Sequence, residues 1–164
     1  MNCYQEIIKI LKNKNVVIIP NVRLITKKRA TTINIQNELT INNIKSQIID
    51  IDTDNINLNN YDAIYFTGRE PKILMEAIYK NNLFNKINNF ITNGEIIIGQ
   101  SADTIIFNKQ YLDTTTEEPK IMNDGFNYGK KKIVPHFEHL PEELLKQLAN
   151  NILKIKDTEQ LIKL

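Results

Sequence analysis

The chain has 164 residues, a length that favours one domain with a single core, and we expect one α/β domain over residues 1–164. Its composition, 41% hydrophobic and 24% charged with a net charge of +2, is that of an ordinary globular protein and gives no support to a nucleic-acid partner or a membrane surface. One cysteine (Cys3), no apolar run near the roughly 18 residues of a membrane span and no secretory signal predict a cytoplasmic protein without an internal disulfide.

The first hundred residues predict helices that alternate with buried strands. Residues 4–12 indicate a short amphipathic helix, and residues 16–19, four apolar residues closed by Pro20, are typical of a central strand buried on both faces. The stretch 21–45 is ambiguous, with a helix expected somewhere between 31 and 45. Further strands are expected at 46–51, 61–66 and 95–99, and further helices at 71–80, which opens with a proline, and at 83–91.

The remaining residues predict a helix, a polar loop, a short strand and a last helix. We expect the helix at 101–107, the polar loop at 109–120, the strand at 133–134, where Pro135 cuts it, and a C-terminal helix from Pro141 to about residue 154. Strands that alternate with helices imply right-handed crossovers and a mainly parallel, doubly wound sheet with helices on both faces. The fold class is therefore α/β.

The most informative segment is 96–103, IIIGQSAD, in which a buried strand runs into Gly99, then Ser101, then a helix. A tight strand-to-helix turn of this kind lifts a serine hydroxyl above the sheet and directs the following backbone N–H groups, with the helix dipole, at a bound oxyanion. Gly99 is expected there because a side chain would crowd the turn. By itself the pattern also fits a Ser101 that only caps a helix.

Two other segments strengthen the first interpretation. Residues 66–71, FTGREP, read as a strand end, a glycine turn and a helix start, which can supply a second oxyanion N–H. Residues 134–139, VPHFEH, contain both histidines of the chain, His136 and His139, directly after a strand, at the edge where α/β sheets gather their sites.

Three segments, in the order in which they occur along the chain, resemble the family of dipeptidase E, aspartyl dipeptidases and cyanophycinases. These segments are 62–78, 93–107 and 133–139. That family has the class I glutamine-amidotransferase-like fold. The resemblance implies that Ser101 is the nucleophile and His136 the base of a serine hydrolase. It also implies that the backbone N–H groups of Gly68 and Ala102 form the oxyanion hole.

The acid that would complete a catalytic triad stays open. In the family it lies between the serine and the histidine, where this chain offers Asp113, Glu117, Glu118 and Asp124. Glu117 is nearest to the expected position, with Glu118 beside it. Glu138 is a further alternative, because the related amidotransferases pair a histidine with a glutamate two residues later. Any of these carboxylates would also suit a solvated surface.

Two departures from the family bear on activity. Its Gly-Gly-Asn turn is Gly68-Arg69-Glu70 here, and its Ser-Ala-Gly elbow is Ser101-Ala102-Asp103. The chain is also shorter, and we expect it to lack the family's first strand and C-terminal strands. A catalytically impaired member that acts as a binding or regulatory module is therefore the alternative to an active hydrolase.

The substrate that the resemblance implies is a short peptide or a related amide, cleaved by acyl transfer. Arg69 or the lysines at 130–132 are candidates to hold a substrate carboxylate. We expect no cofactor: the chain lacks a G-x-G-x-x-G or phosphate loop, which argues against a nucleotide-binding flavodoxin-like domain. We expect no metal, because two histidines three residues apart without a cysteine cluster are a poor zinc ligand set. A homodimer is compatible with the sequence.

Overall fold

The computed structural model describes residues 3–20, 26–67, 70–113, 119–128, 132–135, 140, 142–148 and 152–155. The helices among them are α1 (Cys3–Leu11), α2 (Thr26–Ile41), α3 (Pro71–Lys80), α4 (Phe84–Thr92) and α5 (Glu142–Gln147), with 3₁₀ helices η1 (Leu58–Asn60) and η2 (Ser101–Phe107). The strands are β1 (Asn15–Ile19), β2 (Lys45–Ile48), β3 (Ala63–Phe66), β4 (Ile96–Gly99), β5 (Tyr111–Asp113), β6 (Lys120–Met122), β7 (Lys132–Pro135) and β8 (Ile152–Ile155).

The main sheet has four parallel strands in the order β2-β1-β3-β4. Its register aligns Ile19 of β1 with Phe66 of β3, and Phe66 with Gly99 of β4, so the three strands end side by side. β1 ends at Ile19 because the next residue, Pro20, has no N–H for the sheet. The predicted α/β fold class and the predicted central strand are confirmed.

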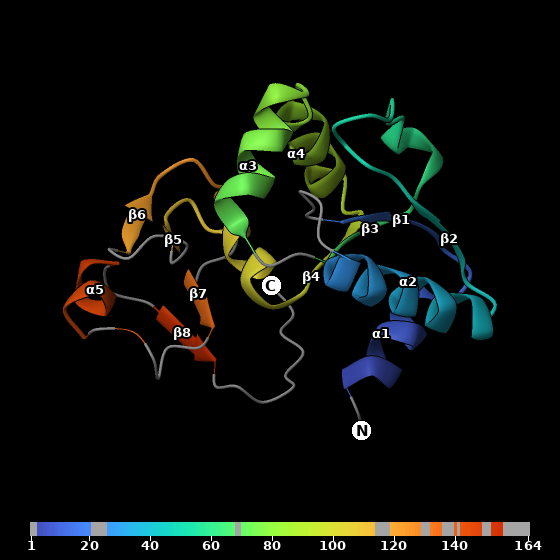
Figure 1. Cartoon of the computed structure of the whole chain (residues 1–164), viewed down its shortest axis with the longest axis horizontal. Coiled ribbons are helices and arrows are strands. Elements are labelled where there is room, and N and C mark those ends of the chain that lie inside the picture. The colour runs from blue at the N-terminus through green and yellow to red at the C-terminus, as the bar shows by residue number, and fades with distance from the viewer. Residues whose placement is uncertain are drawn as a thin grey trace.

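Successive side chains of β1 and β3 point to opposite faces of the sheet and pack into two separate hydrophobic cores, one on each face. Val17 of β1 and Ile64 of β3 pack with the buried residues of α3 and α4. Ile18 and Tyr65, their neighbours in sequence, pack with buried residues of α1 and α2 on the other face. Figure 1 shows the result, with α3 and α4 above the sheet and α1 and α2 below it.

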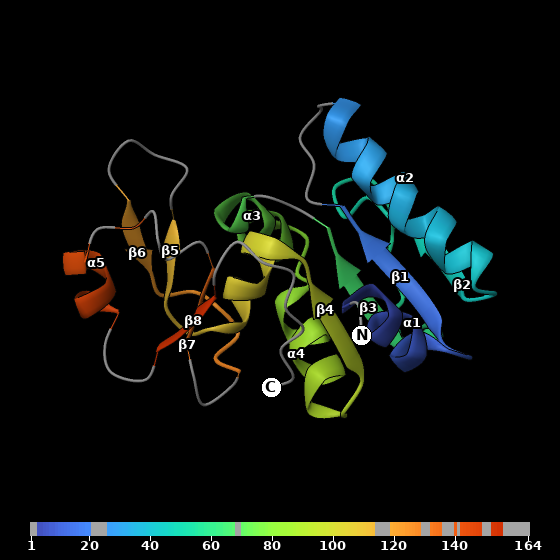
Figure 2. The same cartoon turned by 90° about the horizontal axis from the view of Figure 1, so that it is seen from below.

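The remaining strands form two small sheets at one end of the molecule (Figure 2). β5 and β6 pair in antiparallel fashion, and β7 pairs with β8 in parallel fashion. β7 lies against η2, the 3₁₀ helix that follows β4. Because η2 follows the main sheet directly, this contact joins the small sheets to the edge at which β4 ends.

Three sequence predictions are corrected by these elements. α2 begins at Thr26, before the range in which its helix was expected. The stretch 109–120, expected as a polar loop, contains β5, whose three residues are all buried. The C-terminal helix ends at Gln147 rather than near 154, because residues 152–155 pair with β7 as β8, and this pairing overrides a helical pattern. No described helix is long and apolar enough to cross a membrane.

Candidate functional site

The ends of β1, β3 and β4 at Ile19, Phe66 and Gly99, here called the carboxyl edge, bring two of the predicted segments together. The Thr67 N–H donates to the Ile19 carbonyl at 3.2 Å, and the Gln100 N–H donates to the Phe66 carbonyl at 3.1 Å. The chain therefore leaves β3 and β4 from neighbouring positions. In the sequence, Gly68 follows Thr67 and Ser101 follows Gln100.

Gly99 is required by the close approach of η2 to the end of β4. A Cβ at this position would lie 2.9 Å from the Thr104 Cα and 3.0 Å from the Phe107 ring. The Thr104 hydroxyl also donates to the Gly99 carbonyl at 3.0 Å. The prediction that a side chain would crowd this turn is confirmed.

Ser101 opens η2 directly after the turn, and Ala102 is the second residue of that helix. η2 is a 3₁₀ helix of seven residues. Hydrogen-bond geometry in 3₁₀ helices is poorer than in α-helices, so the aligned dipole expected from the sequence is smaller than that of a long α-helix. Any oxyanion stabilisation at this turn would depend on individual backbone N–H groups.

Asp103, which stands where the family has glycine, is fully buried in the first turn of η2. Its backbone N–H donates to the Gln100 carbonyl at 3.3 Å, so it is part of the turn that Ser101 occupies. The aspartate is therefore not a solvated surface residue. Its carboxylate is held inside the protein two residues from the candidate nucleophile.

Thr67, the residue after β3, is held by a hydrogen bond between two buried hydroxyls. The Oγ1 atoms of Thr67 and Thr32, the latter from α2, lie 2.9 Å apart and share a hydrogen bond. Pro71 occupies the first turn of α3 after Glu70, as its position in the sequence predicts. Thr67 and Pro71, which flank the predicted oxyanion segment in the sequence, are thus both held in place.

β7, the strand that precedes His136 in the sequence, is hydrogen-bonded to Asn108, the residue that follows η2. The Asn108 side chain, 3% exposed, donates from Nδ2 to the Ile133 carbonyl at 3.0 Å. Its Oδ1 accepts from the Ile133 N–H at 3.1 Å. Sequence reasoning did not single out Asn108; the available signal was an amide directly after the apolar run of residues 105–107.

The other predicted site residues lie mainly outside the described part of the chain. Of Ser101 and Ala102 the structure describes the backbone course. Outside the described residues lie Gly68 and Arg69, Glu117 and Glu118, Lys130 and Lys131, and His136, Glu138 and His139. The nucleophile, base, acid and oxyanion assignments therefore stay predictions.

Two carboxylates offered as alternative acids are described. Asp113, 1% exposed, ends β5 and lies 3.9 Å from the Lys72 ammonium in the first turn of α3. Asp124 lies beside Tyr111, whose hydroxyl is buried and has no hydrogen-bond partner within the described part of the protein. Burial first, and the Asp124 carboxylate second, raise the pKa of Tyr111 far above its usual value. Tyr111 is therefore protonated at neutral pH.

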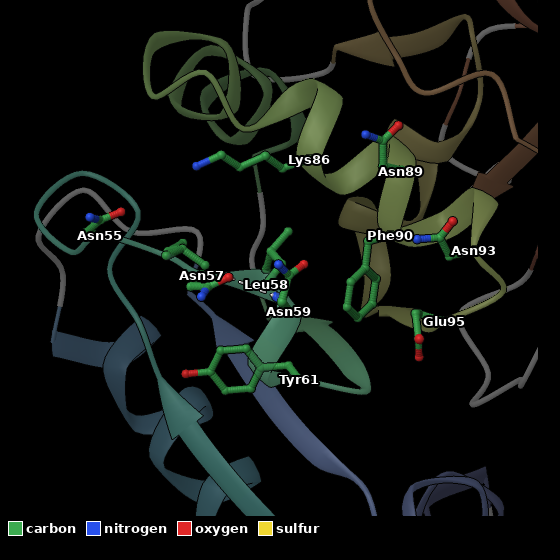
Figure 3. A pocket seen from close by; sticks show the side chains of 11 residues that line it. Asn55, Asn57, Leu58, Asn59, Tyr61, Lys86, Asn89, Phe90, Asn93 and Glu95 are labelled. Carbon is green, nitrogen blue, oxygen red and sulfur yellow. Dashed lines mark hydrogen bonds between the residues drawn. The ribbon is translucent and has the colours of Figure 1, made fainter.

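A cavity of about 580 Å³ lies at the opposite end of the strands, before β3 and β4 begin at Ala63 and Ile96; we call this the amino edge. Four strand residues separate the two edges, about 10 Å. Figure 3 shows Phe90 pointing from α4 toward the loop with Leu58. The cavity is lined by Asn55, Ile56, Asn57, Leu58, Asn59, Tyr61, Lys86, Asn89, Phe90, Asn93 and Glu95.

Among the described residues that line this cavity there is no predicted catalytic residue. One of its amides is already engaged, since the Asn57 side chain accepts from the Asn59 N–H at 3.2 Å. Within the described ranges no three His, Cys, Asp or Glu residues gather to hold a metal ion. The carboxyl edge, with the serine turn and the strand before His136, is the candidate active site.

Comparison with known proteins places this arrangement in a family. The chain has the class I glutamine-amidotransferase-like α/β fold. Its sequence matches peptidase family S51 over residues 2–164, and the chain belongs to that family. The membership agrees with the resemblance found in the three sequence segments. No curated protein matches the chain significantly.

Two solved structures show the same fold. The first, a candidate peptidase E from Listeria monocytogenes EGD-e, is 23% identical with a TM-score of 0.63, and the match covers 84% of this chain and 74% of that one. The second, a peptidase from an acI-B1 Actinobacterium, is 18% identical with a TM-score of 0.66, and covers 90% of this chain and 68% of that one. Neither is similar enough to transfer more than the fold.

Proposed function

We propose that this protein is a serine hydrolase that cleaves a short peptide or a related amide by acyl transfer, with Ser101 as its nucleophile. One observation carries the proposal: β4 runs through a glycine with no room for a side chain directly into the helix that Ser101 opens, beside the end of β3. Membership of peptidase family S51 supports an amide as the bond that is cleaved.

In the proposed mechanism His136 removes the Ser101 proton as the hydroxyl attacks the substrate carbonyl. The backbone N–H groups of Gly68 and Ala102 stabilise the oxyanion that forms. The imidazolium then gives its proton to the leaving amine, and water hydrolyses the acyl-enzyme by the same steps in reverse. The contact of β7 with η2 supports this pairing, because His136 follows β7 in the sequence.

The orienting acid in this proposal is Glu117 or Glu118, with Glu138 as the alternative. Its carboxylate would accept a hydrogen bond from the imidazole nitrogen that faces away from Ser101. Replacing the true acid with glutamine should lower turnover strongly and leave the fold intact. The resemblance to aspartyl dipeptidases favours substrates with an acidic residue, which Arg69 or the lysines at 130–132 would bind.

The chain offers an unusually direct test, because it has only two serines, Ser46 and Ser101. Ser46 lies in β2, on the other side of the central strand β1 from the candidate site. We expect a fluorophosphonate probe to label the wild type and Ser46→Ala, and to leave Ser101→Ala unlabelled. Hydrolysis of a dipeptide panel that includes Asp-X substrates should follow the same pattern.

Two results would count against this function. Equal labelling of Ser101→Ala and the wild type would assign the reaction to another residue. No labelling of either the wild type or Asp103→Gly would favour the alternative, a catalytically impaired member that acts as a binding or regulatory module.

A further inference from the structure

We infer that Asn108 is a positioning residue, which fixes β7, and through it His136, relative to the helix that begins with Ser101. The inference rests on the proposed function, since it concerns the pairing of that nucleophile with that base. It assigns a role to a side chain that lies outside the three segments by which the chain resembles its family.

The first argument is the geometry of the amide. Asn108 directly follows η2, and both polar atoms of its side chain bind the backbone of one residue, Ile133. The two hydrogen bonds measure 3.0 and 3.1 Å and connect residues that are 25 positions apart. Two parallel bonds to the same peptide segment restrict both its sliding and its rotation. A single hydrogen bond or an apolar contact would restrict the sliding and the rotation less.

The second argument is the place of Ile133 in its strand. Ile133 is 1% exposed and lies in β7, which pairs with β8 on one side. In a strand the N–H and C=O of one residue point to the same side. Since both of these groups of Ile133 bind Asn108, they face away from β8. The Asn108 amide therefore takes the place of a further strand on the open side of β7.

The third argument is that Asn108 itself is held firmly. Its backbone N–H donates to the Ile105 carbonyl at 3.0 Å. The segment with Phe126 runs alongside, and the Phe126 N–H donates to the Ile106 carbonyl at 2.8 Å. Gly125 packs so closely that a Cβ there would overlap the Asn108 carbonyl oxygen. The amide thus projects from a backbone with little freedom to move.

These contacts connect the two segments that carry the proposed nucleophile and base. Asn108 is seven residues after Ser101 in the sequence, at the far end of η2, and it binds β7 three residues before His136. β7 continues from Ile133 to Pro135, the residue before His136, so a shift of the strand at Ile133 is carried along it to that residue. A displacement of about 1 Å between catalytic groups can cost about 100-fold in rate.

The test compares Asn108→Leu, which keeps the branched shape of the side chain and removes both bonds, with the wild type. Each variant is labelled with the fluorophosphonate probe across pH 5 to 9, under conditions where circular dichroism shows it to be folded. We expect the labelling rate of Asn108→Leu to fall at least about tenfold. We also expect its pH profile to lose the rise through the histidine pKa and to resemble that of His136→Ala.

Two controls separate positioning from loss of stability. Leu11→Ala removes a fully buried side chain of α1, across the main sheet from η2, and should label at the wild-type rate with the wild-type pH profile while it is folded. Asn108→Asp keeps the size of the side chain and one acceptor. If Asn108→Leu does not fold, Asn108→Asp serves in its place, with a smaller fall in rate and the same change of profile expected.

The outcomes distinguish this inference from the proposed function. If the wild type labels at Ser101 and His136→Ala does not, but folded Asn108 variants keep the wild-type rate and pH profile, the positioning role is wrong and the proposed function stands. If labelling does not depend on Ser101, the proposed function fails, and this inference fails with it.

Discussion

The two edges of the main sheet are built in different ways. At the carboxyl edge polar side chains are buried and paired, as Asn108 is with Ile133 and Thr67 with Thr32. At the amino edge the cavity is lined by exposed asparagines, among them Asn89. Asparagine is common throughout this chain. An asparagine in this chain is therefore structurally important where its side chain is buried and both of its polar atoms are hydrogen-bonded. Lining a cavity is not sufficient.

The largest contrast is expected between two glycines. A Cβ at Gly125 would overlap the Asn108 carbonyl oxygen and lie 2.7 Å from that of Ile106. We expect Gly125→Ala to lower the free energy of unfolding by about 3 kcal/mol or more, or to prevent folding. Gly94, at the amino edge, has nothing within 4 Å of its Cβ position and a φ of +82°. Gly94→Ala should cost about 1–2 kcal/mol, from backbone strain alone.

Urea unfolding of both variants gives the measurement. Equal losses at the two glycines would show that the packing around Gly125 is looser than described, and the contrast between the edges would weaken.

The next contrast is between the two asparagines. Asn108→Leu leaves the N–H and C=O of Ile133 buried without partners, each at about 1–3 kcal/mol, so we expect a loss of about 2–5 kcal/mol in the free energy of unfolding. Asn89→Leu, on the exposed face of α4, should change it by about 0.5 kcal/mol or less. The same urea experiment compares them. A loss at Asn89 as large as that at Asn108 would contradict the interpretation of the amino edge as solvated surface.

A smaller effect, on rate, is expected at Asp103. Its carboxylate is buried two residues from Ser101, and a negative charge near a developing oxyanion raises the barrier. About 1.4 kcal/mol of such repulsion corresponds to a factor of ten. We therefore expect wild-type activity to be weak and Asp103→Gly to label about tenfold faster with the fluorophosphonate. Rapid wild-type labelling, unchanged in Asp103→Gly and abolished in Ser101→Ala, would show that the aspartate does no harm.

The sequence predicted the elements whose evidence is local. β1 follows from four consecutive apolar residues and Pro20, and the start of α3 follows from Pro71. The requirement for Gly99 follows from the tight turn between a strand and a helix. Each of these depends on neighbours in the sequence, which is why pattern reasoning found them.

The elements it missed depend on distant partners. β5 is buried although polar residues surround it in the sequence, and β8 is a strand because β7 pairs with it. Asn108 gains its role from Ile133, 25 residues away. A single sequence gives no indication that two residues so far apart along the chain are in contact. The candidate site was predicted as a set of segments, and the bonds that hold those segments together came from the structure.

The last and smallest contrast concerns Tyr111, where the pairing of buried polar groups is incomplete. Its hydroxyl has no hydrogen-bond partner within the described residues, and burial, followed by the Asp124 carboxylate, raises the pKa of Tyr111 above that of an unfolded tyrosine. An acid whose pKa is raised by folding contributes its full stability below the unfolded value of about 10 and loses it as the pH rises beyond that value. One such proton accounts for up to about 1.4 kcal/mol of unfolding free energy per pH unit.

We therefore expect Tyr111→Phe to lose less stability than the wild type between pH 10 and 11, and to equal or slightly exceed it near pH 7. Tyr79→Phe is the matched control, because the Tyr79 hydroxyl donates to the Asp124 carbonyl at 2.8 Å. It should cost about 1 kcal/mol at neutral pH. Urea unfolding at pH 7, 10 and 11 measures both. If Tyr111→Phe were as alkali-sensitive as the wild type, or lost as much at pH 7 as Tyr79→Phe, the Tyr111 hydroxyl would have to be paired after all. The rule that buried polar groups in this part of the fold are paired would then extend to Tyr111.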